Sequence, residues 1–212
     1  MINGSAWSRA TCPSRRLRYK VSQLQNLLDD LKSGDEARAE RAVTELIELG
    51  QDAIPSLLDL TESSDADTRW WALRTLAESP LCQTEWLVPF LRNDPAPEVR
   101  QCAALGLAER PDEGAIKPLV HALNDEDGMV NGLAAHALVR IGGAAVPTLI
   151  ETVTNGAQSA RIHALRALAE IKDHRAIPIM MKVMQEDSAL LQHWAKEGLD
   201  RLGLDMVYIK SV

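Results

Sequence analysis

The stretch "VRQCAALGLAERPDEGAIKPLVHAL", residues 99–123, decides the fold of this chain. Its first half places apolar or small residues at helical spacing, with alanine where two helices can approach closely. Its second half is a second apolar segment with a proline near its front, which suits the first turn of a helix. The stretch therefore predicts two helices joined by a tight turn.

The same pattern recurs six times along the 212 residues. An alanine of the first helix returns at intervals of 30 or 31 residues, and a leucine follows each alanine four residues later. The aligned pairs are Ala42 and Leu46, Ala72 and Leu76, Ala103 and Leu107, Ala134 and Leu138, Ala164 and Leu168, and Ala195 and Leu199. One helix pair cannot bury its apolar face alone, so neighbouring pairs must stack. The predicted fold is all-α, a right-handed α-solenoid of about six helix-pair repeats.

The pattern also predicts the domain organisation. Residues 1–20 are expected to form a basic, disordered leader, residues 21–203 the repeat domain, and residues 204–212 a capping tail. We expect Met206, Val207, Tyr208 and Ile209 of this tail to fold over the last repeat. Within the repeat domain, a capping helix is predicted at 21–32 and repeats near 35–62, 66–92, 96–124, 127–154, 157–185 and 187–203.

The charge distribution argues against binding of nucleic acid. The chain carries a net charge of −7, but the basic leader contributes +5, which leaves −12 for residues 21–212. Such a surface repels phosphate backbones, whose binding depends on Lys and Arg. The leader could still contact nucleic acid or an acidic partner, but we interpret it as a disordered or wrongly started segment.

Other classes of protein are excluded by what the sequence lacks. No apolar run approaches the roughly 18–20 residues that span a bilayer, and no apolar segment of a secretory signal is found, so a cytoplasmic protein is expected. Cys12, Cys82 and Cys102 are far apart and include no CxxC pair. We therefore expect buried, reduced thiols, and neither a metal site nor a cofactor.

Residues 99–123, with their echoes at 130–153 and 160–184, resemble the short HEAT-like repeats named after phycobilisome lyases. The resemblance extends over about residues 21–203. It implies a HEAT-like superhelix whose second helices line a concave surface. It also implies that arginines at the second position of the first helices reach an acid in a neighbouring turn; these are Arg69, Arg100 and Arg161, replaced elsewhere by Asn131 and Gln192.

The search for catalytic residues yields no candidate. None of the five histidines is followed by glutamate, which excludes the His-Glu dyads that the HEAT-type deoxyhypusine hydroxylase would use to bind iron. His136, His163 and His193 occupy different positions of their repeats, so no stacked metal-binding row is predicted. The acids of the turns are interpreted as helix starters and solvated groups, namely Asp65, Asp67, Asp94, Glu98, Asp125 and Asp127.

The second helices are predicted to present a strip of mixed charge on the concave surface. The outward residues are Ser56, Asp59, Lys117, His121, Thr148, Glu151, Thr152, Ile179 and Lys182. The residues predicted to be buried on the same helices are Ile54, Leu57, Leu58, Ile116, Leu119, Val120, Leu123, Val146, Leu149, Ile150, Val153, Ile177, Met180, Met181 and Met184. Such a strip suits a protein partner better than a polyanion, and a merely solvated surface is the alternative.

The second repeat concentrates large aromatic residues, which are favoured anchors at protein interfaces. Trp86 and Phe90 are four residues apart and share a helix face. The adjacent Trp70 and Trp71 point about 100° apart on a helix. Trp71 precedes the packing alanine and is expected to lie at the flank of the inter-repeat contact, whereas Trp70 is expected to be substantially exposed. Trp70, Trp86 and Phe90 are therefore candidate partner-binding residues.

Three functions compete for this sequence. The first is a non-catalytic interaction or scaffold module that holds a protein partner on its concave surface. The second, implied by the resemblance, is a subunit of a phycobilin lyase or a related chromophore-protein maturation factor, with a bilin or a phycobiliprotein as partner. Lyase subunits of that family work in pairs, so the chain alone is expected to be inactive. The third is a DNA-lesion-binding solenoid of the alkylation-repair type, which the acidic repeats oppose.

Overall fold

The computed structural model describes residues 13–186 and 188–204, with side chains from residue 21 onward. Helices make up every regular element of these residues, and they contain no strand, which confirms the all-α prediction. The chain divides into two compact units, Met1–Thr75 and Leu76–Val212. The division falls inside α4 (Ala66–Glu78). No helix of the described residues is both long and apolar enough to span a bilayer.

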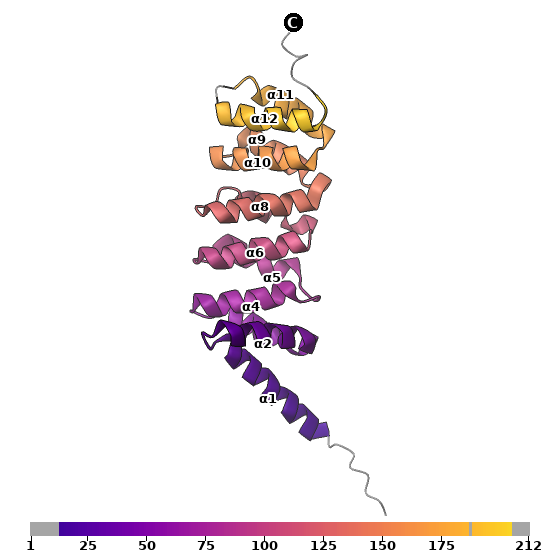
Figure 1. The fold of residues 1–212 in the computed structure, drawn as a ribbon. Helices are drawn as coiled ribbons and strands as arrows, with labels where there is room; N and C mark the ends of the chain where they lie inside the picture. Colours follow the sequence, from indigo (N-terminus) through magenta and orange to yellow (C-terminus); the bar gives the residue numbers. More distant parts are fainter. Residues whose placement is uncertain (1–12, 187, 205–212) are drawn as a thin grey trace, which may run out of the picture. The chain divides into compact units, whose positions relative to one another are not determined.

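The first unit holds α1 (Pro13–Leu31), α2 (Glu36–Leu49), α3 (Ile54–Thr61) and most of α4. α1 packs against α2 and buries leucine side chains at its C-terminal end (Figure 1). The helix begins at Pro13, so it includes residues 13–20 of the expected leader. Residues 1–12 of the predicted leader lie outside the described residues.

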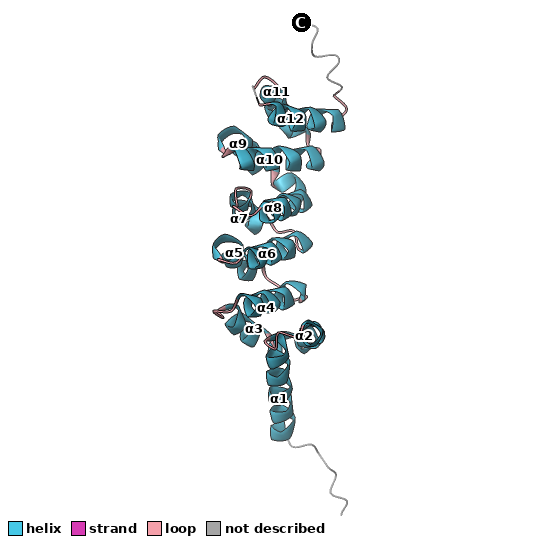
Figure 2. Ribbon diagram, turned by 60° about the vertical axis from the view of Figure 1, so that its left-hand side comes forward, coloured by secondary structure: helices cyan, strands magenta, loops and turns pink. Residues whose placement is uncertain are grey.

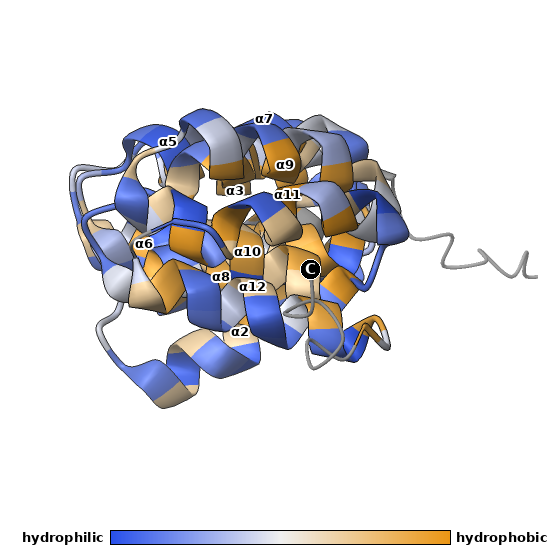
Figure 3. Cartoon of the chain, turned by 90° about the horizontal axis from the view of Figure 1, so that it is seen from above, coloured by the Kyte–Doolittle hydropathy of each residue, from blue (hydrophilic) through white to orange (hydrophobic). Residues whose placement is uncertain are grey.

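The second unit consists of two layers of helices. Viewed from above, α6, α8, α10 and α12 form one layer and α5, α7, α9 and α11 the other (Figure 3). Short loops join each helix to the next (Figure 2). The bounds are α5 Thr84–Asn93, α6 Pro97–Glu109, α7 Ile116–Ala122, α8 Gly128–Ile141, α9 Val146–Asn155, α10 Gln158–Ile171, α11 Ile177–Val183 and α12 Ala189–Arg201.

The aligned alanines and leucines form the core, as predicted. Every one of these side chains is at most 1% exposed. Alanine keeps the helices of neighbouring repeats close, and leucine fills the space between the two layers. The register read from the sequence therefore places the buried stripe of each first helix correctly.

Four of the turns inside the repeats are built in two ways. In the turns before α7 and α11, an aspartate accepts a hydrogen bond from the backbone N–H two residues later; the pairs are Asp112 with Gly114 and Asp173 with Arg175. In the turns before α3 and α9, a glycine at positive φ ends the first helix: Gly50 at 57° and Gly142 at 75°. In each of these four turns, a 3-10 helix of three residues leads into the second helix.

Three expectations about the second helices are corrected by the structure. Met181, predicted to be buried, is 40% exposed. Thr152, predicted to point outward, is only 8% exposed, because its hydroxyl donates to the Thr148 carbonyl of its own helix at 2.8 Å and no longer needs water. The second apolar segment of the second repeat, residues 86–91, was expected to place its proline in the first turn of a helix, but Pro89 lies inside α5, because the helix already begins at Thr84. The tail residues expected to fold back, Met206 to Ile209, lie outside the described residues.

Candidate functional site

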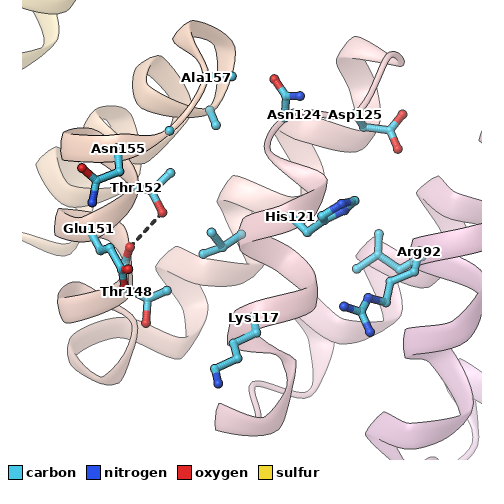
Figure 4. Close-up of a pocket in the computed structure, with 14 residues that line it drawn as sticks. Arg92, Lys117, His121, Asn124, Asp125, Thr148, Glu151, Thr152, Asn155 and Ala157 are labelled. Carbon is cyan, nitrogen blue, oxygen red and sulfur yellow. Dashed lines mark hydrogen bonds between the residues drawn. The ribbon is translucent and has the colours of Figure 1, made fainter.

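A groove with a volume of about 510 Å³ opens on the second-helix layer of the second unit. Its walls come mainly from α7 and α9, with the end of α5 and the beginning of α10 completing them (Figure 4). The lining residues are Leu91, Arg92, Lys117, Val120, His121, Asn124, Asp125, Thr148, Glu151, Thr152, Asn155, Gly156, Ala157 and Ala160.

Helical spacing brings four of the predicted partner-binding residues into this groove. Lys117 and His121 are four residues apart and therefore share one face of α7. Thr148 and Glu151 are three residues apart on α9 and share a face in the same way. The two faces line opposite sides of the groove (Figure 4).

The floor of the groove is apolar. Leu91 is 2% exposed and Ala160 is 5% exposed, and both belong to the packed core. Val120, which also lines the groove, is half-buried. An apolar floor below polar walls is the usual arrangement of sites that hold a partly apolar ligand.

One acid of the lining is already neutralised. Asp125 accepts two hydrogen bonds from Arg100, from Nε at 2.9 Å and from Nη2 at 2.8 Å. Both side chains are largely buried, with 8% and 13% of their surface exposed. The hydrogen bonds to Asp125 raise the pKa of Arg100 above its ordinary value. Asp125 is therefore a structural group that happens to border the groove.

The other charges of the groove have no such partner. Arg92, Lys117 and Glu151 are exposed, and none of them forms an ion pair with another described residue. Arg92 on α5 and Lys117 on α7 project from one side, and Glu151 on α9 projects from the other (Figure 4). The groove thus offers two free cations and one free carboxylate to a ligand.

The remaining predicted residues lie elsewhere. Lys182 on α11 is exposed but does not line the groove. Trp86 and Phe90 on α5 are half-buried and do not line it either. Asp59 is exposed on α3 in the first unit. Of the strip predicted on the second helices, only the residues on α7 and α9 therefore meet in the groove.

The predicted separation of the two adjacent tryptophans is wrong. Trp70 is half-buried like Trp71, and the two rings meet edge to face with their centroids 4.8 Å apart. The Arg74 guanidinium lies 5.4 Å from the ring centroid of Trp70 and 5.3 Å from that of Trp71. Arg74 is fixed in turn by Glu40 at 2.6 Å. The neighbouring ring and this cation cover the side chain that was expected to be exposed.

Sequence reasoning missed the residues at the ends of the groove. These are Arg92, Asn124, Asp125 and Asn155. Two of them could have been found by extending the spacing of the predicted residues by one more turn. Asp125 follows His121 by four residues, and Asn155 follows Glu151 by four. Asp125 had been interpreted only as a helix starter.

The second-position arginines Arg100 and Arg161 form the structural ion pairs that the resemblance implied. Arg161 donates to Glu186 at 2.7 and 2.6 Å, just as Arg100 donates to Asp125. Each acid stands 25 residues after its arginine. Asn131 and Gln192 at the equivalent positions donate instead to the backbone carbonyls of Asp125 and Glu186. This position therefore holds successive turns in place.

Family comparisons match two parts of the chain. Residues 84–157 match HEAT repeats, and residues 160–186 match the PBS lyase HEAT-like repeat. The chain is 39% identical over 90 residues to the bilin biosynthesis protein RpcF of Synechococcus sp. (strain WH8020), over 42% of this chain and 43% of the relative. It is 30% identical over 113 residues to a phycocyanobilin lyase subunit beta of Nostoc sp., over 53% and 56%. The chain thus spans about half the length of these relatives.

Solved structures agree in fold. An archaeal HEAT-like repeat protein from Thermococcus onnurineus NA1 aligns with a TM-score of 0.59 and 16% identity, over 84% of this chain and 80% of the other. The complex of CpcE and CpcF of phycocyanin lyase from Nostoc sp. aligns with a TM-score of 0.54 and 23% identity, over 69% and 98%. At these identities the likeness shows the HEAT-like solenoid fold alone.

Proposed function

The chain is a HEAT-like repeat protein with a repeat of the PBS lyase type, and from this we propose that it acts as one subunit of a phycobilin lyase or of a related chromophore-protein maturation factor. Two relatives that it matches at 39% and 30% identity carry names of bilin biosynthesis and of a phycocyanobilin lyase subunit. In this proposal the chain supplies a binding surface and needs a second subunit for catalysis.

The observation that carries the proposal is the set of unpaired charges in the groove. A linear tetrapyrrole carries two propionate carboxylates and several pyrrole N–H donors. Arg92 and Lys117 suit the carboxylates, and Glu151 on the opposite wall suits the N–H groups. The volume of about 510 Å³ falls within the range of roughly 300–1,000 Å³ that is usual for small-molecule sites.

A pigment titration tests this proposal directly. The full chain is mixed with phycocyanobilin, and the shift in visible absorbance gives the dissociation constant. Lys117→Glu should raise that constant about tenfold, because it replaces an attracting charge by a repelling one. Lys182→Glu is the matched control, since it makes the same charge change on α11 outside the groove. It should leave the titration unchanged.

A further arm adds the second lyase subunit and an acceptor phycobiliprotein to the mixture. If pigment neither binds the chain nor is transferred in the complete mixture, the role in bilin attachment is wrong. Equal effects of the two lysine substitutions would show that the groove is not the pigment site.

A protein-scaffold function is the second candidate, and the mixed charge of the groove favours it. Both signs of charge and two free amides, Asn124 and Asn155, can complement a polar protein surface. Affinity capture from a native lysate, followed by mass spectrometry, tests it with the wild-type chain and Lys117→Glu side by side. A stoichiometric partner that is retained without pigment and lost in the variant supports this function. If the Lys117→Glu variant still captures every protein that the wild-type chain captures, the scaffold function is contradicted.

A further inference from the structure

The first helices of the second unit carry exposed large apolar side chains that do not line the groove. We call the outward side of α6, α8, α10 and α12, which lie one above the next in Figure 1, the first-helix face. Leu105 on α6 is 48% exposed, Met129 on α8 is 62% exposed, and Leu190 on α12 is 49% exposed. Among the described residues, the other exposed large apolar side chains are Val21, at 61%, and Met181, at 40%. Leu105 lies in the second half of α6, whereas Met129 and Leu190 lie at the beginnings of α8 and α12, and α10 contributes no exposed large apolar side chain.

The first helices also carry a row of charges. Six residues after its aligned alanine, each first helix carries an exposed charged residue, and the signs alternate along the stack: Glu109, Arg140, Glu170 and Arg201. α12 also exposes Asp200 beside Arg201. Arg201 is bonded to Glu197 of its own helix at 2.9 Å. The other three form no ion pair with another described residue.

The helix dipole accounts for the sign of only two of these four charged residues. A cation near the C-terminal end of a helix is favourable, because it meets the negative end of the helix dipole. Arg140 and Arg201 follow that rule. Glu109 is the last residue of α6 and Glu170 lies in the last turn of α10, where an acid is unfavourable. The two glutamates therefore call for a partner outside their own helices.

An alternating row of four charges is complementary to itself when it is reversed. We propose that the first-helix face binds a second copy of this chain across a two-fold axis that runs parallel to the first helices. In that arrangement Glu109 faces Arg201 of the second copy, and Arg140 faces Glu170 of the second copy. Each contact occurs twice, as a two-fold interface requires.

The size of the face is adequate for such an interface. Four helices that lie about 8–10 Å apart and are roughly 20 Å long present about 700 Å² per copy. A standard interface takes about 800 Å² from each partner. The exposed apolar side chains supply the burial, and the charge row fixes the register of the two copies.

The mass of the full chain in solution tests the proposal. Light scattering and sedimentation, between about 1 and 100 μM, should show a species of twice the 23.3 kDa chain mass. Arg140→Glu should raise the dissociation constant of the dimer roughly tenfold or more, because it sets two pairs of like charges against each other. The double variant Arg140→Glu, Glu170→Arg should restore the dimer, since the swapped charges face each other again.

Controls separate this proposal from the pigment site. Lys117→Glu in the groove should leave the dimer intact, and Arg140→Glu should leave the pigment titration intact. Far-UV circular dichroism spectra of the exposed-charge variants should match the wild type, which excludes misfolding.

Three results would overturn the second-copy interface. The first is a monomer at 100 μM. The second is a charge-swapped double variant that stays dissociated while the single variant is dissociated. The third is a monomer that pairs with a different lyase subunit through Arg140, which would assign the face to another protein.

Discussion

Alternate repeats of the second unit differ in a consistent way. The α6–α7 and α10–α11 repeats carry Arg100 and Arg161 at the second position, an aspartate-started turn and a second helix of 7 residues. The α8–α9 repeat between them carries Asn131, a glycine-started turn and a second helix of 10 residues. Two neighbouring repeats of nearly equal length are therefore built by different local chemistry.

What stays constant between the two kinds of repeat is one hydrogen bond to the backbone. Arg100 and Asn131 each donate to the carbonyl of the residue six positions earlier, and Arg161 donates to the Val153 carbonyl, eight positions earlier. What varies is the ion pair to the following turn. The residue 25 positions after Asn131 is Gly156, where a Cβ atom would lie 2.5 Å from the Thr152 carbonyl oxygen. No acid fits there, so a neutral donor is the compatible choice at residue 131.

The largest expected effect comes from removing the ion pair. Arg100→Ala should lower the free energy of unfolding by about 3–5 kcal/mol, because it leaves the buried Asp125 carboxylate uncompensated. Urea denaturation followed by circular dichroism measures the change. Arg92→Ala, an exposed arginine of the groove, is the control and should change stability by less than about 0.5 kcal/mol. A loss below 1 kcal/mol for Arg100→Ala would show that the ion pair is not what distinguishes these repeats.

Grafting the arginine into the other kind of repeat should also destabilise it. Asn131→Arg should lower the free energy of unfolding by about 2–3 kcal/mol, because the guanidinium would be buried without an acid. Asn131→Ala, which loses one hydrogen bond, should lower it by about 1 kcal/mol. The same denaturation experiment compares them. If Asn131→Arg is as stable as the wild type, the repeats are interchangeable at this position after all.

The glycine-started turn gives a smaller effect with a matched control. Gly142 adopts φ 75° and ψ −134°, a region that side chains disfavour, so Gly142→Ala should lower the free energy of unfolding by about 1–2 kcal/mol. Gly132 lies inside α8, and nothing lies within 4 Å of an added Cβ atom. Gly132→Ala should therefore raise stability by up to about 1 kcal/mol. Equal thermal melts of the two variants would contradict the strain at Gly142.

The contribution of the aspartate-started turn to the free energy of unfolding should depend on pH in the acidic range. Hydrogen bonds from the Arg175 side chain and backbone hold the pKa of Asp173 at about 2, below its ordinary 3.8. Its contribution to stability is therefore fully present above pH 4 and is lost as the pH falls towards 2. Asp173→Asn should show a shallower loss of unfolding free energy between pH 4 and 2. Identical pH profiles for the variant and the wild type would contradict this account.

Much of this architecture could be predicted from the sequence, because it depends on local spacing. The alanine and leucine register fixed the buried stripes, and four-residue spacing placed Lys117 beside His121. The exposure of Trp70 could not be predicted, because it depends on Arg74 and on an ion pair to Glu40, 34 residues away. The burial of Thr152 escaped for another reason. Its hydroxyl is satisfied within its own helix, which helix periodicity does not reveal.

The alternation of turns constrains how the array could grow or shrink. Arg100 and Arg161 are 61 residues apart, which is the length of two repeats. Excising residues 97–157 would place Arg161 where Arg100 stands and keep the order of the two turn types. Excising a single repeat would instead place Asn131 at the position of Arg100. The order of the aspartate-started and glycine-started turns would then change. From α6 to α11, therefore, removing a double repeat keeps the order of the turns, whereas removing a single repeat does not.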